Sequence, residues 1–260
     1  YSSAASDVYK RQDTQSSRNV QRIIKGYVSP SYNTSKKLLD RLGLKGVLRS
    51  DVIVGSGVEA YETLDKALDC IAMSKFEDAE RLISQLRTMF YSNVEINNIV
   101  LEYLEIWLQM LKDEVEFSEV VNRLESLLPF KYSEIGKYKY LVKHERMILS
   151  TYIECLGKME KYEAIPDYDK MTSWITNELS KKQFASIFED LNMRYANSYG
   201  NAGHYEKSDR IAEEGIRIEI ECERMHCLNT LLYCRAWNAG ERGNVSENDK
   251  ELCRCAYEIA

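Results

Sequence analysis

Helix-breaking residues and long apolar runs are scarce in this chain of 260 residues. It has only three prolines and twelve glycines, so few positions interrupt regular structure. No run approaches the roughly 18 apolar residues of a membrane-spanning helix, and the sequence predicts no membrane contact. Charged residues make up 29% of the chain, and Leu, Ile, Tyr and Glu are abundant. This composition is typical of a helix-rich globular protein.

The cysteines form no disulfide framework. Seven is an odd number and five follow residue 220, so a reduced, cytoplasmic chain is the simplest interpretation. A zinc site can be imagined near the C-terminus from Cys222, His226, Cys227, Cys253 and Cys255. Their spacing fits no known zinc finger. Packing positions are expected instead for Cys227, Cys234 and Cys253. We therefore expect no metal.

Signals of catalysis are equally few. The chain has three histidines, and no nucleophile stands in a pattern with a general base. The glycines are not followed by the Lys-Ser/Thr pair of a phosphate-binding loop. Acidic pairs are plentiful, but on helices they indicate solvated faces. The sequence predicts a protein that is not an enzyme and needs no cofactor.

One interpretation gives the first residues of the chain a non-native origin. Ser2–Gln12, SSAASDVYKRQ, resembles a transposase-based sequencing adapter read in frame, because one choice of eleven consecutive codons gives that adapter. Residues 1–12 would then be a non-native tail, and native sequence would begin near Asp13 with the true start missing. The alternative is a polar, disordered N-terminal tail.

Charge is distributed unevenly along the chain. Residues 13–49 hold eight basic side chains against two acidic ones, a net charge of +6, and residues 1–12 add +1. Because the whole chain carries −6, residues 50–260 carry −13. A basic head on an acidic body suggests that the head meets a polyanion.

Within the basic head, the pattern predicts two short helices. The first has apolar side chains at helical spacing, Val20, Ile23 and Ile24. It ends at Gly26, which reaches positive φ easily, and a turn around Pro30 follows. The second runs from about Thr34 to Gly43 with an apolar face of Leu38, Leu39 and Leu42.

This arrangement resembles the second half of a lambda-repressor-like (XRE-type) helix-turn-helix domain. The residues in register are Ser16, Val20, Arg22, Ile23, Gly26, Pro30, Ser31, Leu42 and Gly43. Ile24 stands where that family usually has Glu. The resemblance implies that residues 13–44 are the C-terminal part of such a domain, whose first two helices are absent. The alternative is a basic helical hairpin with no DNA role.

Site residues follow from the same resemblance. The helix 17–25 would lie in the major groove as the recognition helix. The residues implied to face base edges are Ser17, Arg18, Asn19 and Gln21. Those implied to meet phosphates are Arg22, Lys25, Lys36 and Lys37.

After a Gly- and Ser-containing linker at 45–57, the chain repeats. Four segments share an aromatic residue followed by a helical pattern: Phe76, Phe117, Tyr162 and Tyr205, at spacings of 41, 45 and 43 residues. A period of this size predicts an all-α helical solenoid over residues 58–260, with about five helical hairpins. Pro166 should shorten the second helix of the third hairpin, since proline is tolerated only in a first turn.

The repeats resemble the tetratricopeptide repeat, although their period is longer than the roughly 34 residues of that family. The fourth unit is nearest to the consensus, with Tyr195, Ala196, Tyr199, Gly203 and Tyr205. The resemblance implies a right-handed superhelix in which the first helix of each hairpin lines a concave groove. The groove positions are Glu105, Gln109, Ser150, Glu154, Met193, Asn197, Asn201, Tyr233 and Trp237. We call these nine residues the candidate peptide face.

Amides and carboxylates spaced along a groove suit an extended peptide, because Asn and Gln can both donate and accept. For each residue alone, a solvated polar position is the favoured explanation, whereas the row taken together favours peptide binding. The last helix has an apolar stripe of Leu252, Cys255, Ala256 and Ile259. The stripe predicts truncation at this end or burial in a partner.

Together, the head and the repeats resemble the peptide-responsive RNPP/Rgg transcriptional regulators of Gram-positive bacteria. The resemblance implies quorum sensing: a signalling peptide in the groove, a homodimer and binding to double-stranded DNA. The main alternative is a repeat-based protein–protein adaptor that does not bind DNA. An enzyme built on similar repeats, such as a phosphatase, is a third interpretation.

Overall fold

The computed structural model describes residues 21–22, 55, 57–128, 131, 141–172 and 185–260. The chain divides into two units, residues 1–50 and residues 51–260. Nearly all described residues belong to the second unit. The predicted domain bounds and the linker at 45–57 stay predictions.

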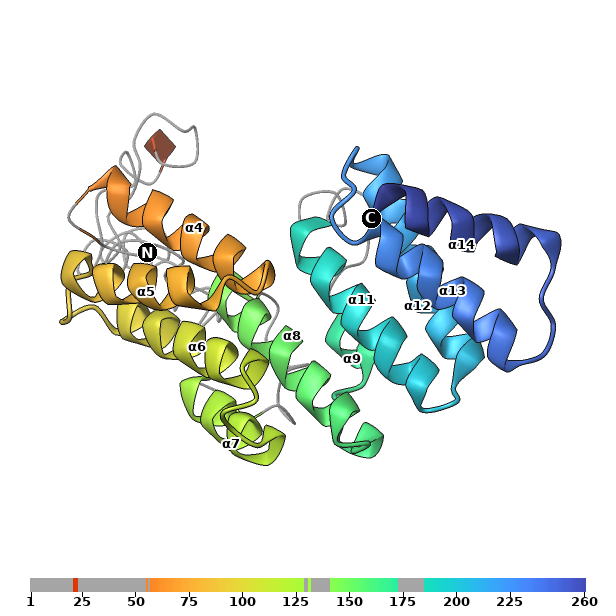
Figure 1. Cartoon of the computed structure of the whole chain (residues 1–260), viewed down its shortest axis with the longest axis horizontal. Helices are drawn as coiled ribbons and strands as arrows, with labels where there is room; N and C mark the ends of the chain where they lie inside the picture. Colours follow the sequence, from red (N-terminus) through yellow and green to blue (C-terminus); the bar gives the residue numbers. More distant parts are fainter. Residues whose placement is uncertain (1–20, 23–54, 56, 129–130, 132–140, 173–184) are drawn as a thin grey trace, which may run out of the picture. The chain divides into compact units, whose positions relative to one another are not determined.

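The second unit is a row of helical hairpins (Figure 1). The first helices of the hairpins are α4 (Val58–Ala72), α6 (Glu95–Leu111), α8 (Lys143–Lys158), α11 (Ala185–Asn201) and α13 (Leu228–Glu241). Four second helices are α5 (Phe76–Met89), α7 (Phe117–Leu127), α12 (Tyr205–Glu221) and α14 (Glu247–Ile259). Helices pack mainly on their neighbours in the chain. The predicted all-α repeat fold is therefore confirmed.

The third hairpin is irregular in its second half. A 3₁₀ turn, η2 (Tyr162–Ala164), precedes Pro166, and the short helix α9 (Tyr168–Thr172) begins only after the proline. Proline lacks the N–H that a helix interior needs. The proline thus separates the two helical pieces, as the sequence predicts.

The repeating aromatics mark the start of the second helices. Phe76, Phe117 and Tyr205 are the first residues of α5, α7 and α12, and Tyr162 is the first residue of η2. Each of the four is partly buried and packs beside apolar neighbours or, at Tyr205, against Trp237. The aromatic therefore anchors the turn between the two helices of its hairpin.

Each first helix ends in the same turn. A residue at positive φ follows the helix, and the next N–H donates to a carbonyl five residues back, which is the Schellman motif. At the end of α11, for example, Gly203 has φ 76° and the N–H of His204 donates to the carbonyl of Tyr199 at 2.8 Å. The other positive-φ residues that end first helices are Ser74, Asp113, Glu160 and Gly243.

Two substitutions at this turn should change the stability of the protein in opposite directions, because one adds a Cβ at positive φ and the other removes one. Gly203→Ala should lower the free energy of unfolding by about 1 kcal/mol, because a Cβ is unfavourable at positive φ. Glu160→Gly, at φ 56°, should raise it by up to about 1 kcal/mol for the same reason. Urea unfolding followed by circular dichroism measures both. Equal effects of one sign would contradict the shared turn.

The fourth and fifth hairpins approach closely at a buried polar contact. A Cβ on Gly200 would stand 2.8 Å from Asn238 Oδ1 and 3.2 Å from Ser208 Oγ. Ser208 donates to the carbonyl of Ala196 at 2.7 Å, and Asn238 donates to Ser208 at 2.8 Å. Glycine at this position lets three helices, α11, α12 and α13, share these hydrogen bonds.

The last helix packs by its apolar stripe. It forms a small separate core with α13, in which Ala256 is buried and the other three stripe residues are half-buried. Its partners are Leu228, Leu232 and Ile216. A neighbouring helix thus covers part of the stripe. Within the ranges given above, no helix combines the length and the apolar character needed to cross a membrane.

Candidate functional site

The predicted DNA-contacting residues fall mostly outside the described residues. Gln21 and Arg22 are helical and exposed. The remaining six, which the structure does not describe, are Ser17, Arg18, Asn19, Lys25, Lys36 and Lys37. Their role in DNA binding stays a prediction.

The candidate peptide face falls on four first helices. The helix α6 contacts α8, α8 contacts α11, and α11 contacts α13. Residues that are up to 132 positions apart in the chain, from Glu105 to Trp237, are therefore carried on one connected series of helices. Whether these residues bind a peptide stays a prediction.

On α6, both predicted residues are engaged with neighbouring second helices. Glu105 accepts a hydrogen bond from Arg87 Nε of α5 at 3.0 Å. Gln109 Oε1 accepts one from Arg123 Nη1 of α7 at 2.7 Å. These polar side chains join helices in the described structure, and a ligand would have to compete with their arginine partners.

The predicted residues of α8 differ in exposure. Ser150 is only 7% exposed, so its side chain presents little surface. Glu154 forms an ion pair with Arg194 of α11, with 2.9 Å between Oε2 and Nη1. Sequence reasoning missed Arg194, although it directly follows the predicted Met193. A charged residue beside a predicted groove position was the available signal.

Three predicted residues form a stripe along α11. Met193, Asn197 and Asn201 are spaced by four residues and so share one helix face. Met193 is half-buried against the main core, Asn197 is half-buried, and Asn201 is exposed. In the part of the chain that the structure describes, no hydrogen bond engages the Asn197 amide. This amide therefore keeps its donors and its acceptor for another molecule.

The α13 residues add aromatic surface. Tyr233 is 53% exposed. Trp237 is half-buried and stands edge-on to Tyr205, with ring centroids 6.3 Å apart and an interplanar angle of 69°. Aromatic rings supply large apolar contact area with a polar tip, so they suit binding surfaces. The face thus combines an amide stripe, an Arg–Glu pair and two aromatic side chains.

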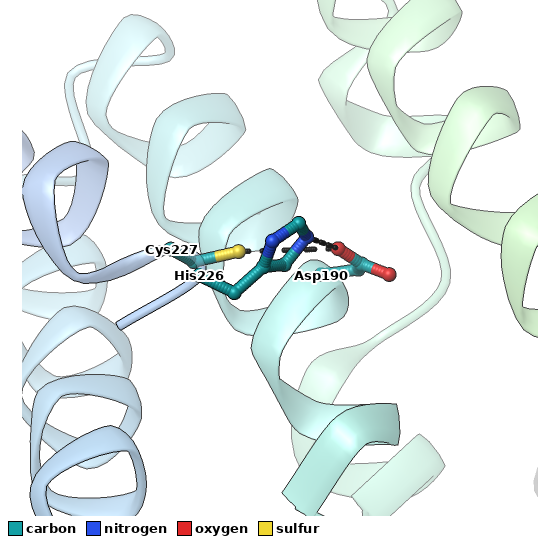
Figure 2. A group of neighbouring side chains, drawn as sticks. All are labelled: Asp190, His226 and Cys227. Carbon is teal, nitrogen blue, oxygen red and sulfur yellow. Dashed lines mark hydrogen bonds and ion pairs between the residues drawn. The ribbon is translucent and has the colours of Figure 1, made fainter. Parts of the chain in front are cut away.

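The structure gathers a second group of side chains, in which two residues of the imagined zinc site, His226 and Cys227, meet an aspartate that the sequence did not indicate. Figure 2 shows Asp190 of α11 facing His226 and Cys227, which lie in the connection from α12 to α13. Asp190 Oδ1 is 3.4 Å from His226 Nε2 and 3.9 Å from Cys227 Sγ. The hydrogen bond that His226 donates to the Asp190 carboxylate raises the pKa of His226.

The cysteine expectations need one correction. Cys227 and Cys234 are buried, as expected for packing residues, but Cys253 is exposed. Cys253 lies on a face of α14 outside the apolar stripe, and this face is exposed to solvent. Asp190 was not considered as a zinc ligand from the sequence, because it lies 36 positions before His226.

Comparisons with known proteins give one informative likeness. No protein-family model and no curated protein matches the sequence. A solved structure of Bacillus thuringiensis PlcR in complex with the peptide PapR7 and DNA is similar in fold, with a TM-score of 0.62 and 13% sequence identity. The match covers 95% of this chain and 86% of that one. At this identity, the likeness establishes a shared helical-repeat fold.

Proposed function

We propose that this protein is a DNA-binding transcriptional regulator whose repeat domain binds a short peptide. One observation carries the proposal: the fold is similar to PlcR over 95% of the chain, and that PlcR structure holds both a peptide and DNA. Similar folds can host different functions. The residues of the head and of the candidate peptide face must therefore support the assignment independently.

The first helices support peptide binding by their chemistry. The Asn197 amide can donate to a peptide carbonyl and accept from the N–H of the same residue. The Arg194–Glu154 pair, in which each side chain is less than one-third exposed, offers both charges at low exposure. A peptide carboxylate could pair with Arg194 in place of Glu154, since Arg binds carboxylates through two parallel hydrogen bonds.

The basic head supports DNA binding by its charge. Its net charge of +6 over residues 13–49 contrasts with −13 over residues 50–260. Lysines and arginines on DNA neutralise phosphates and release counterions, which favours binding at low salt. A protein–protein adaptor would explain the repeats equally well, but it would not need this separation of charge.

Regulation would then follow from a population shift. In a homodimer, the two heads can take more than one relative arrangement, and only some of these fit two half-sites on DNA. A peptide that binds one arrangement of the repeats more tightly changes the fraction of dimers able to bind the operator. The cytoplasm is the compartment where such a regulator would act.

The DNA assignment predicts different behaviour for two basic residues. The protein should bind duplex DNA with an affinity that falls steeply with salt. Arg18→Ala should reduce discrimination between bases by about 1–3 kcal/mol, whereas Lys36→Ala should weaken all sequences alike and lower the salt dependence.

Fluorescence anisotropy on a duplex selected from a random library, and on an unrelated duplex, measures both effects. Equal losses on the two duplexes for both variants would contradict base recognition by Arg18. Absence of salt-dependent binding to any duplex would favour the adaptor.

A further inference from the structure

The group formed by Asp190, His226 and Cys227 lies where two hairpins meet. Asp190 belongs to the first half of α11, and Cys227 is the residue immediately before α13. Because α11 and α12 form an antiparallel hairpin, the end of α12 and the connection that follows return to the beginning of α11 (Figure 1). The fold therefore brings together side chains that are far apart in the sequence.

The spacing of the three ligand atoms suits one metal ion. A carboxylate oxygen of Asp190, an imidazole nitrogen of His226 and the sulfur of Cys227 all lie within 4.8 Å of one another. Metal bonds of about 2.0–2.3 Å place tetrahedral ligands about 3.3–3.8 Å apart. The distances from Asp190 Oδ1 to His226 Nε2 and to Cys227 Sγ, 3.4 and 3.9 Å, are close to this separation between ligand atoms.

The surroundings of the group are rich in negative charge. Glu189 is 2% exposed and Glu219 is fully buried. Glu189 pairs with Arg224, and Glu219 Oε1 accepts a hydrogen bond from the backbone N–H of Cys227 at 3.2 Å. The second carboxylate oxygen of Glu219 is buried and has no hydrogen-bond partner among the described residues.

Three carboxylates lie at this place. Glu189 pairs with Arg224 and Asp190 with the imidazole of His226, so Glu219 is the one left without a cationic partner among the described residues. Arg194 also acts on Cys227 electrostatically, but it is paired with Glu154. A buried carboxylate without a matching positive charge is costly. Burial also raises the pKa of Glu189 and of the Cys227 thiol. A divalent cation would offset this excess of negative charge.

We propose that Asp190, His226 and Cys227 bind a divalent transition-metal ion of the zinc class, with a fourth position open to water. A mixed set of oxygen, nitrogen and sulfur ligands fits Zn²⁺, whereas Mg²⁺ and Ca²⁺ prefer oxygen alone. Asp190 and His226 are accessible to solvent, whereas Cys227 is buried. On binding, the sulfur–metal bond forms and the thiol proton passes to solvent, because a thiolate is the metal ligand.

The bound ion would connect α11 to the turn that precedes α13. It would thereby join the fourth and fifth hairpins at an end of α11 distant from Asn201. The three ligands are close together only in the folded protein, so the metal should bind the folded state and raise the thermal midpoint of unfolding. This consequence is independent of any peptide or DNA.

Cobalt titration of the full chain tests the site directly. Co²⁺ added to the reduced protein, in the absence of peptide and DNA, should produce a thiolate-to-cobalt charge-transfer band that saturates at one ion per chain. Zn²⁺ should abolish this band by displacement. Asp190→Asn, His226→Gln and Cys227→Ser should each weaken Co²⁺ affinity by about tenfold or more, since even an outer partner of a metal ligand can be worth that factor.

Two matched controls use residues outside the group. Cys253→Ser, at an exposed thiol, and His204→Gln, at an exposed imidazole, should leave the stoichiometry and affinity unchanged. Circular dichroism without metal checks that each variant is folded. A band that survives Cys227→Ser, or that disappears with Cys253→Ser, would overturn the proposal. So would the absence of any saturating band in the folded wild-type protein.

Because these measurements use no DNA or peptide, their failure leaves the proposed regulatory function untouched. Conversely, a regulator that binds DNA but no Co²⁺ would contradict the metal site alone.

Discussion

Tyr195→Ala should lower the free energy of unfolding by about 3–5 kcal/mol, the usual cost of removing a large buried aromatic side chain. Tyr195 is fully buried in the main core. Its ring stands edge-on to Tyr168, with centroids 5.2 Å apart, and stacks on Tyr199 at 6.0 Å. The residue thus fills the contact between the third and fourth hairpins, and truncation would leave a cavity there.

Tyr195→Phe is the matched control. Among the described residues, the Tyr195 hydroxyl donates only to the sulfur of Met171, at 3.5 Å, and a thioether is a weak acceptor. Removing the hydroxyl should therefore cost no more than about 1 kcal/mol. Urea unfolding followed by far-ultraviolet circular dichroism compares the two variants. If Tyr195→Ala were no more destabilising than Tyr195→Phe, the ring would not be the anchor of this contact.

The effect should also change the shape of the unfolding curve. In a helical repeat, stability is approximately a sum of terms within each repeat and terms between neighbours. Tyr195 contributes to a term between neighbours through Tyr168 of α9. Its loss should uncouple the two parts of the array and broaden the transition, whereas Tyr195→Phe should leave the transition sharp.

The repeat fold was predictable because its signals are local. An aromatic at the start of each second helix recurs at spacings of 41, 45 and 43 residues. The four aromatics occupy the same place in four hairpins. Pro166 likewise acts through its own backbone, because the ring and the missing N–H exclude it from a helix interior.

The turns were only partly predictable. Gly203 and Gly243 mark left-handed positions by their residue type, but Ser74, Asp113 and Glu160 adopt the same conformation without glycine. Packing of the two helices imposes the turn there at the cost of some backbone strain. Sequence alone offers no sign of this, because tertiary contacts decide it.

The candidate sites differ in the same way. Repeat positions place Asn197 and Glu154 on first helices, but they do not reveal that Ser150 is buried or that Glu154 pairs with Arg194. The burial depends on how α8 and α11 pack. The approach of Asp190 to His226 depends on the antiparallel hairpin of α11 and α12, so no spacing rule for metal ligands could find it.

Asn197→Ala should weaken peptide binding by about 1–3 kcal/mol while leaving the fold nearly unchanged. The expected loss is the cost of leaving a desolvated peptide group without its hydrogen-bond partner. The side chain is half-buried, and no hydrogen bond to it occurs in the described part of the protein. Its removal should therefore change the free energy of unfolding by only about 0.5 kcal/mol or less.

Asn122→Ala provides the control of the same residue type. Asn122 is exposed on α7, a second helix, and lies outside the candidate peptide face. A peptide selected from a pooled library of short synthetic peptides serves as the probe, and titration calorimetry measures its affinity for each variant. Asn122→Ala should bind it as tightly as the wild-type protein does.

The two variants separate binding from folding. Asn197→Ala should lose affinity by a factor of about 5–150, which corresponds to 1–3 kcal/mol, at an unchanged thermal midpoint. A selected peptide whose affinity is the same for both variants would show that Asn197 is a solvated surface residue. If affinity fell equally in both, the peptide would occupy a different face of the hairpins, and the assignment of the first helices to ligand binding would be wrong.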